Sequence, residues 1–353
     1  MSKRKKVIRI IIGVVTGSFI CFLAGVYGMF REQLAAMGTI RKLDKRLYYM
    51  EYAGDYGFEE FLSRGGAASD EEVGEYLTEF LSHGFYRTEV KTQKQGCSTV
   101  RAASEEGGFL FGRNYDWKDC TIMIVKTKPK NGYASVSTCN MDYLGFGEGY
   151  LPEGMKNKML ALASVYVPLD GMNEKGLCVA DLMIDVNEKT DQNSMQGDLT
   201  TTTAIRLLLD QAADVEEAIE LFKQYNMHSS AGLMHHLTIS DQSGNSVVAE
   251  YVDQKLVVTK TPVVTNFFLA QGEKQGIGSR QSKKRFSILE SFLSENEKTD
   301  VAGMRDALQS VSQRTMGEEF EKTVWSIVYD QKNGELHYFF REDYKREYPF
   351  TVK

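Results

Sequence analysis

Cys97 is the residue of this 353-residue chain whose surroundings most suggest covalent chemistry. A nucleophilic thiol needs a base and an environment that favours the thiolate. Histidine is the usual base, but none of the five histidines lies in a recognisable cysteine–histidine protease signature. We therefore expect that, if Cys97 is catalytic, a group other than histidine accepts its proton.

A free α-amino group is another base that a protein can supply, because its pKa of about 8 lets it accept a proton at neutral pH. Cleavage between Gly96 and Cys97 would make Cys97 the first residue of a new chain, so that its own amine could activate its thiol. Gly96 leaves that bond unhindered, and the polar stretch "KTQKQG" (91–96) suits an accessible segment. The alternative is an ordinary cysteine that stays within the chain.

Arg113 and Asp116 lie in "FLFGRNYDW" (109–117), one expected strand after Cys97. Two antiparallel strands joined by a turn near "SEEGG" would bring both side chains back beside Cys97. An arginine there would lower the thiol pKa, and a carboxylate could hold the α-amine in place. The alternative for this Arg-x-x-Asp pattern is a surface ion pair that contributes little.

The pair of motifs "GCSTV" and "FGRNYDW" resembles the start of the catalytic chain in the linear amide C–N hydrolases of the N-terminal nucleophile (Ntn) superfamily. These include choloylglycine hydrolases, penicillin V acylases, N-acylethanolamine acid amidases and the related penicillin acyltransferases. The resemblance covers nearly all of residues 97–341. It continues, in order, through six further segments: "DGMNEKGLCVADLM" (170–183), "TTTAIRLLLDQAADVEEAIELFKQYN" (201–226), "HHLTISDQSGNSVVAEY" (235–251), "VVTNFF" (263–268), "KKRFSILESFL" (283–293) and "TVWSIVYD" (323–330).

The resemblance implies a role for each matching residue. Cys97 would be the nucleophile and its freed amine the base, with Arg113 and Asp116 tuning the thiol and orienting the amine. Asn266 matches the asparagine whose amide helps to form the oxyanion hole, and such donors stabilise the tetrahedral intermediate. Arg285, in "KRF", matches the arginine that holds the charge network of the site together.

One position departs from the bile-salt hydrolases, which carry a polar oxyanion-hole side chain on the strand after "MNEKG". Met183 corresponds to it here, and a thioether cannot donate a hydrogen bond. A backbone N–H, or Asp181 or Asn173 in a shifted register, are the alternatives for the second donor. Arg280 is the alternative to Arg285. Together with the long segment before Cys97, this departure favours the amidase and acyltransferase branch.

The N-terminus has the composition of a membrane anchor. A basic cluster, Lys3 to Lys6, precedes 21 uncharged residues from Ile10 to Phe30. A helix of about 20 apolar residues spans a bilayer core, and flanking lysines stay in the cytoplasm. A cleaved signal peptide is the alternative, although its apolar core is usually about 7–15 residues long. We expect an uncleaved, single-pass signal anchor in the cell membrane, with the rest of the chain outside the cytoplasm.

Three regions are therefore expected: an anchor (1–30), a helical prosegment (31–96) and a catalytic domain (97–353). In the prosegment, helical spacing marks 58–66 and 69–85, and Ser69 with Glu72 resembles a capping box. Strands are expected at 97–103, 107–114, 121–127, 133–140, 160–167, 176–184, 235–241, 246–252, 255–260, 263–268, 323–330 and 335–343. Helices are expected at 205–212, 215–222 and 281–312.

Because strands and helices come in blocks, an α+β fold of antiparallel sheets covered by helices is favoured over a doubly wound parallel sheet. The resemblance implies the four-layer αββα sandwich of Ntn hydrolases.

Composition restricts the partners. The net charge of −6 argues against general nucleic-acid binding. The five cysteines fit neither a zinc pattern nor a disulfide framework, although Cys120 and Cys139 could in principle pair. We expect no metal and no organic cofactor. The expected partners are a small-molecule acyl amide, the membrane and the chain's own cleaved prosegment. Two other functions remain open: an acyltransferase of the same fold, and a non-catalytic surface-anchored binding protein.

Overall fold

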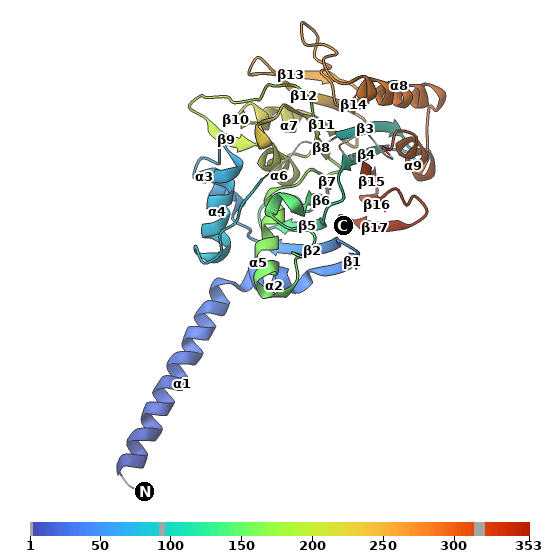
Figure 1. Ribbon diagram of the computed structural model, residues 1–353. Coiled ribbons are helices and arrows are strands. Elements are labelled where there is room, and N and C mark those ends of the chain that lie inside the picture. Colours follow the sequence, from blue (N-terminus) through green and yellow to red (C-terminus); the bar gives the residue numbers. More distant parts are fainter. Residues whose placement is uncertain (1–2, 92–95, 314–321) are drawn as a thin grey trace.

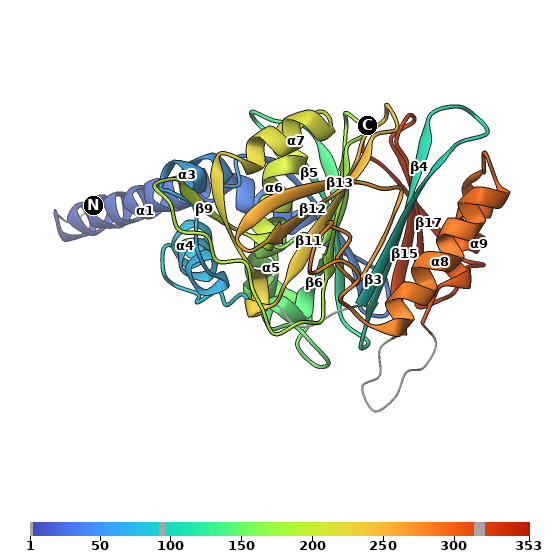
Figure 2. The ribbon, with the colours of Figure 1, turned by 90° about the horizontal axis from the view of Figure 1, so that it is seen from above.

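Two β-sheets pack face to face in this protein, and each carries helices on its outer face (Figure 2). The computed structural model describes residues 3–91, 96–313 and 322–353. The strands are β1 Arg41–Asp44, β2 Leu47–Gly54, β3 Gly96–Ala103, β4 Phe109–Trp117, β5 Ile122–Pro129, β6 Ser135–Asn140, β7 Asp170–Asn173, β8 Cys178–Met183, β9 Gly197–Thr200, β10 Tyr225–His228, β11 His235–Ser240, β12 Ser246–Val252, β13 Lys255–Lys260, β14 Val263–Thr265, β15 Lys322–Asp330, β16 Glu335–Phe340 and β17 Glu347–Thr351.

The nine-stranded sheet has the order β1-β2-β5-β6-β7-β8-β11-β12-β13, and the six-stranded sheet has the order β14-β3-β4-β15-β16-β17. The helices are α1 Lys3–Met29, α2 Arg31–Thr39, α3 Phe58–Ser63, α4 Asp70–Ser82, α5 Gly154–Ala161, α6 Thr201–Gln211, α7 Val215–Phe222, α8 Arg280–Glu295 and α9 Val301–Ser310, with short 3₁₀ turns η1 Met141–Leu144, η2 Leu162–Tyr166 and η3 Ser230–Gly232. Helices α6 and α7 cover the larger sheet, and α8 and α9 cover the smaller one. The expected αββα sandwich is confirmed.

The central strands show why four layers form. Strands β6, β8 and β11 are buried at every residue, so both of their faces are covered. One face of the larger sheet packs against the smaller sheet, and the other packs under α6 and α7. Their sequences, SVSTCN, CVADLM and HHLTIS, nevertheless include several polar residues, which are buried within the fold.

The segment from 31 to 91, which we call the N-terminal segment, is not helical throughout as expected. Residues 41–54 form β1 and β2 instead, and β2 runs parallel to β5 over eight residue pairs, from Leu47↔Ile122 to Gly54↔Pro129. The larger sheet is therefore antiparallel except at this one pairing among its strands. The aromatic residues in "LYYMEY" (47–52) suit a strand, whereas the helical spacing that predicted this region lies after it, at 58–66 and 69–85.

Residues 160–167 were expected as a strand and instead end α5 and form η2. From Ala161 to Val167 every residue is buried, so an apolar run without a polar face imitates a buried strand. The expected cap at Ser69 is present, because its Oγ accepts a bond from Glu72 N–H at 3.2 Å. In a capping box, the glutamate carboxylate also accepts a hydrogen bond from the N–H of the capping residue. Here the Glu72 carboxylate accepts from Ala68 N–H rather than from Ser69 N–H. Cys120 and Cys139 are buried free thiols.

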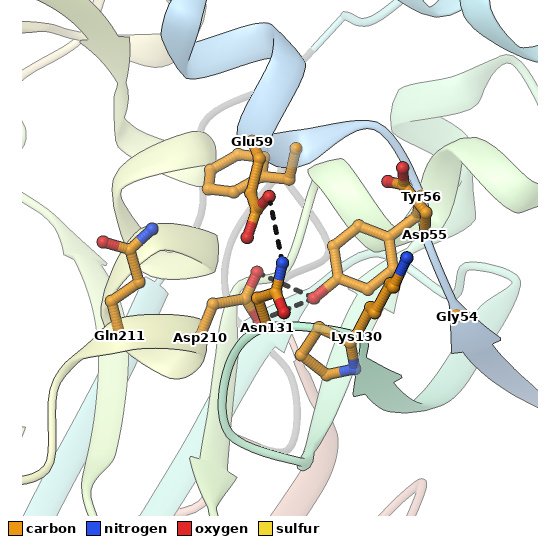
Figure 3. Close-up of a pocket in the computed structure, with 10 residues that line it drawn as sticks. Gly54, Asp55, Tyr56, Glu59, Lys130, Asn131, Asp210 and Gln211 are labelled. Atoms are coloured by element: carbon orange, nitrogen blue, oxygen red, sulfur yellow. Dashed lines mark hydrogen bonds between the residues drawn. The ribbon is translucent and has the colours of Figure 1, made fainter.

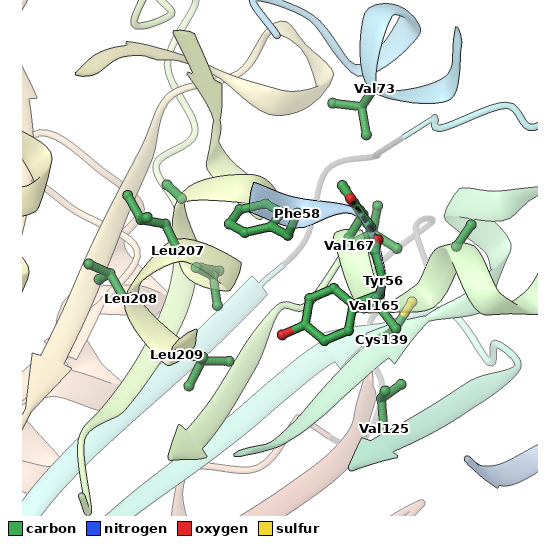
Figure 4. Close-up of a cluster of buried hydrophobic side chains, with 14 of the residues drawn as sticks. Tyr56, Phe58, Val73, Val125, Cys139, Val165, Val167, Leu207, Leu208 and Leu209 are labelled. Carbon is green, nitrogen blue, oxygen red and sulfur yellow. Dashed lines mark hydrogen bonds between the residues drawn. The ribbon is translucent and has the colours of Figure 1, made fainter. Parts of the chain in front are cut away.

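The largest apolar core joins the N-terminal segment to the rest of the chain. Figure 4 shows Tyr56, Phe58 and Val73 of that segment packed with Val125 of β5 and with the leucines of α6. Each of these side chains is at most 3% exposed. The N-terminal segment is therefore an integral layer of the fold.

A small cavity of about 120 Å³ lies at the same junction. Figure 3 shows Tyr56 and Glu59 of the N-terminal segment facing Asn131 and Asp210 across it. The Tyr56 hydroxyl lies 2.7 Å from both carboxylate oxygens of Asp210, whose charge is paired with Arg206 at 2.6 Å. The junction thus combines an apolar core with a buried polar network.

Helix α1 projects away from the sandwich (Figure 1). Its stretch Ile11–Met29 is 19 residues long with a mean hydropathy of 2.0, and none of it is buried against the protein. Among the described residues it is the one helix long and apolar enough to cross a membrane. A signal sequence would have the same properties.

Candidate active site

Cys97 is the second residue of β3, an inner strand of the smaller sheet, and its side chain is completely buried. Strand β4 runs back antiparallel beside it, which places Tyr115 opposite Cys97 and Arg113 opposite Thr99. Directly opposed residues share a face of the sheet, so these four side chains point between the two sheets. The expected return of the Arg-x-x-Asp motif to Cys97 is therefore present.

The backbone of Cys97 is held by two side chains. Its N–H donates to Oδ1 of Asn266 at 2.8 Å, and its carbonyl oxygen accepts from Nη1 of Arg285 at 2.6 Å. Nη2 of Arg285 also donates to Asn266 Oδ1 at 2.8 Å. Asn266 comes directly after β14, and Arg285 lies on α8, so segments far from Cys97 in the chain fix its position.

Asp116 completes this group from the other face of β4. One carboxylate oxygen accepts from Arg285 Nη1 at 3.2 Å, and the other accepts from the Thr323 hydroxyl at 2.7 Å. Asp116 is completely buried, so its charge depends on these partners. The side chain of Asp116 thus holds Arg285 in place, and Arg285 in turn holds the backbone of Cys97.

Arg113 lies on the face of the thiol and is paired across the two sheets. Its Nε donates to Asp170 Oδ2 at 3.2 Å, and both side chains are completely buried. Asp170 also accepts from Trp325 Nε1 at 3.0 Å and from the Tyr329 hydroxyl at 2.9 Å. Asp170, Trp325 and Thr323 are not among the site residues predicted from the sequence. All three lie inside segments that carry the Ntn resemblance, which was the available signal.

Burial raises the pKa of the Cys97 thiol to about 12, against the opposing effect of the Arg113 charge. The thiol is therefore protonated at neutral pH while residue 97 remains inside the chain. Nη2 of Arg113 is buried and has no hydrogen-bond acceptor within the described ranges. The site thus holds a cationic donor on the thiol's face of the sheet.

The alternatives for the oxyanion hole differ in position. The side-chain amide of Asn266 donates to the backbone carbonyl of Met183 at 2.7 Å, so Met183 takes part through its main chain. Asp181, two residues earlier on β8, lies 2.8 Å from Nδ1 of His235. The methionine thioether and the Asp181 carboxylate are thus not donors to an oxyanion in this arrangement.

Asn173 serves the fold rather than the oxyanion. Its Nδ2 donates to the carbonyl oxygens of Leu209 and Ala212 at the end of α6, so both of its N–H groups are occupied. Of the alternatives for the second donor, Asn173 is therefore the one whose side-chain hydrogens are both used within the fold. Arg280, the alternative to Arg285, is an exposed residue at the start of α8. In the described part of the chain, no group of three or more His, Cys, Asp or Glu residues could hold a metal ion.

A cysteine near the start of an inner strand, between two sheets that are each covered by helices, defines the Ntn-hydrolase fold. The family model for acyl-coenzyme A:6-aminopenicillanic acid acyl-transferase matches residues 103–344, and the chain belongs to this family. It is also 31% identical over 99 residues to the penicillin V acylase of Pectobacterium atrosepticum. That match covers 25% of this chain and about a quarter (26%) of the acylase.

Solved structures share the fold at low identity. Two variants of the conjugated bile acid hydrolase of Clostridium perfringens give a TM-score of 0.53 at 17% and 19% identity, over 72% of this chain and 92% of theirs. The penicillin V acylase of Agrobacterium tumefaciens gives 0.50 at 20% identity, over 69% of this chain and 83% of its own. These solved structures therefore share the Ntn-hydrolase fold with this chain, and the family model over residues 103–344 gives its family.

Proposed function

We propose that this protein is a cysteine amidohydrolase that cuts its own chain between Gly96 and Cys97 and then hydrolyses linear, non-peptide amides. The observation that carries the proposal is that Asn266, Arg285 and Arg113 converge on Cys97 from three different elements. A cysteine that served only packing would not need its N–H and its carbonyl held by side chains from distant segments, with a buried guanidinium on the same face of the sheet as its thiol.

Self-cleavage uses the thiol that burial keeps protonated. The sulfur of Cys97 adds to the carbonyl carbon of Gly96, the peptide C–N bond breaks, and the nitrogen of Cys97 takes up the thiol proton. Water then hydrolyses the thioester, which restores the thiol and leaves residue 96 with a carboxylate. The products are the anchored prosegment and a catalytic chain that begins with a free amine at Cys97.

In turnover, the amine of Cys97 accepts the thiol proton and the sulfur attacks the carbonyl carbon of the substrate amide. Arg113, with its Nη2 available, stabilises the thiolate. Asn266 Nδ2 donates to the oxyanion of the tetrahedral intermediate. The C–N bond breaks, the leaving amine takes the proton, and water hydrolyses the thioester to a carboxylic acid. Asp116 and Arg285 keep the terminal residue in position.

The proposal is tested with the full-length chain. Intact mass and N-terminal sequencing should find a new terminus at Cys97, whereas Cys97→Ala should remain full length and inactive. Screening the processed protein against bile-salt, fatty-acyl, penicillin V and acyl-homoserine-lactone amides identifies the substrate. An active protein in which residue 97 is still joined to Gly96 overturns the mechanism.

A second candidate is an acyltransferase, which the name of the matching family favours. An amine would then replace water in resolving the thioester. Product analysis with and without an added amine acceptor separates the two: transfer predicts a new amide that forms at the expense of the free acid.

We propose further that α1 anchors the protein in the cell membrane with the catalytic domain outside the cytoplasm. The support is the apolar stretch Ile11–Met29 behind a basic N-terminus. Membrane fractions should contain the intact N-terminus, and protease added outside the cell should digest the sandwich. A mature protein that lacks residues 1–30 would identify α1 as a cleaved signal.

A further inference from the structure

Large apolar side chains are exposed near the end of α1. Phe85 is 83% exposed and Met155 is 71% exposed, and Tyr86 and Tyr150 are each more than one-third exposed. We call these four residues the basal patch. Exposed groups of large apolar side chains in a folded protein mark an interaction surface.

Phe85 and Tyr86 lie next to the point where α1 ends. Phe30, the residue after α1, packs edge-on against His83 with ring centroids 5.2 Å apart. His83 caps the C-terminus of α4 in a left-handed conformation, with φ of 48°, and so turns the chain outward. Phe85 follows two residues later. This half of the patch is therefore held close to the last turn of α1.

The other half of the patch comes from α5 and the residues before it. Lys156 of α5 lies over the ring of Tyr86, with its Nζ 5.7 Å from the ring centroid, so α5, which also carries Met155, is in contact with Tyr86. Lys158 donates to the carbonyl of Met37 at 3.4 Å, which ties α5 to α2 directly after α1. Figure 1 shows α2 and α5 together at the C-terminal end of α1, where the helix joins the sandwich.

The length of α1 sets the height of the membrane surface. Its 19-residue apolar stretch is about 30 Å long, which matches the hydrocarbon core of a bilayer. Because that stretch ends at Met29, the boundary of the core falls beside Phe30 and His83. The basal patch then lies at the level of the lipid headgroups.

We propose that the basal patch inserts into the headgroup region of the bilayer that α1 crosses, so that the catalytic domain lies against the membrane in one orientation. Tyrosine is enriched at this depth because its ring is apolar and its hydroxyl is polar. Lys156, whose ammonium lies over the Tyr86 ring, carries a charge that suits lipid phosphates, whereas Arg87 beside it is paired with Glu89 at 3.6 Å. The inference rests on the anchoring role proposed for α1.

Site-directed spin labelling of the full-length Cys97→Ala chain in liposomes tests this. Native Cys21, exposed on α1, is one labelling site. In a Cys21→Ser background, Phe85→Cys and Met155→Cys are the test sites. Met195→Cys is the matched control, because Met195 is fully exposed before β9, away from α1. Accessibility to oxygen, which concentrates in lipid, is compared with accessibility to a water-soluble nickel chelate.

We expect the label at Cys21 to be deep in the bilayer. The labels at 85 and 155 should show an oxygen-to-nickel ratio several-fold above that at 195. A deep Cys21 with labels at 85 and 155 that match the control overturns the inference but keeps the anchor; a second copy or a protein partner would then be the occupant of the patch. A water-accessible Cys21 overturns both the anchor and the inference.

Discussion

The side-chain amide of Asn266 donates a 2.7 Å hydrogen bond to the backbone carbonyl of Met183, while its oxygen accepts the N–H of Cys97 at 2.8 Å. One side chain thus connects the nucleophile to the end of β8. The same Nδ2 atom is the donor that the mechanism assigns to the oxyanion. It carries two hydrogens, so one can stay on the Met183 carbonyl while the other points to the substrate oxygen.

Asn266→Ala is expected to lower kcat by about 10²–10³ with a smaller change in KM, because the lost donor acts chiefly on the transition state. The measured rate is divided by the fraction of chains that carry a free terminus at Cys97, because the variant could also slow self-cleavage. Asn187→Ala, at an exposed position, is the control and should keep full activity. An unchanged kcat in Asn266→Ala would remove this residue from the oxyanion hole.

Asp170→Asn is expected to destabilise the protein by about 3–5 kcal/mol, because it leaves the buried charge of Arg113 without its partner. The measurement is urea unfolding in the Cys97→Ala background, so that cleavage does not intervene. The control is Asp306→Asn, which breaks a surface pair with Arg305 and should cost less than about 1 kcal/mol. Equal losses in the two variants would contradict the structural role of the inter-sheet pair.

His235 is expected to carry two ring protons at neutral pH. Nδ1 faces the Asp181 carboxylate at 2.8 Å and Nε2 faces the Ser230 carbonyl at 2.9 Å, and both partners accept hydrogen bonds. Burial acts to lower the pKa of this imidazole, but the Asp181 charge and these bonds outweigh it, so its pKa is raised above 6.5. The ¹⁵N shifts of the ring should report the imidazolium at pH 7.

The same pair makes stability depend on pH. Because the folded-state pKa is the higher one, its contribution is complete below about pH 6.5 and is lost as the pH rises through the folded-state value. Asp181→Asn should remove this decline from the pH profile of unfolding in the Cys97→Ala background. A neutral imidazole at pH 7, or the same profile in both proteins, would show that the pair does not hold the proton.

Much of the site could be predicted because its residues lie in motifs of short range. Cys97, Arg113 and Asp116 needed only one hairpin to meet, and β3 and β4 form it. Asn266 and Arg285 were assigned through the resemblance, since no local pattern links them to Cys97. Asp170 was missed because its partner, Arg113, lies on the opposite sheet. A contact between two stacked sheets leaves no pattern in the sequence of either strand that would link the two residues.

The fold was predicted less well before Cys97 than after it. Spacing indicated helices for 58–66 and 69–85, where α3 and α4 lie, but the residues before them form β1 and β2 of the larger sheet. A strand that pairs in parallel with β5, far along the chain, depends on contacts that the local sequence does not contain. Because β2 is part of the larger sheet, cleavage at Gly96 is not expected to release the prosegment.

The prosegment is expected to stay bound after cleavage at Gly96. Strand β2 is an inner strand of the larger sheet, paired with β1 and β5, and its removal would leave the edge of β5 unpaired. It would also expose Tyr56, Phe58 and Val73, which are now at most 3% exposed. The two chains should co-elute on gel filtration in native buffer, although they separate in denaturing gels.

Tyr56→Phe tests the polar part of that junction. Removing the hydroxyl takes a donor from the buried Asp210 carboxylate and should weaken association of the two chains by about 1–3 kcal/mol. The control is Tyr150→Phe, which removes a hydroxyl from an exposed tyrosine outside this junction. The midpoint of urea-induced chain dissociation should fall for Tyr56→Phe alone. If native buffer already separates the wild-type chains, the N-terminal segment is a removable cover, and anchoring by α1 could not hold the catalytic chain at the membrane.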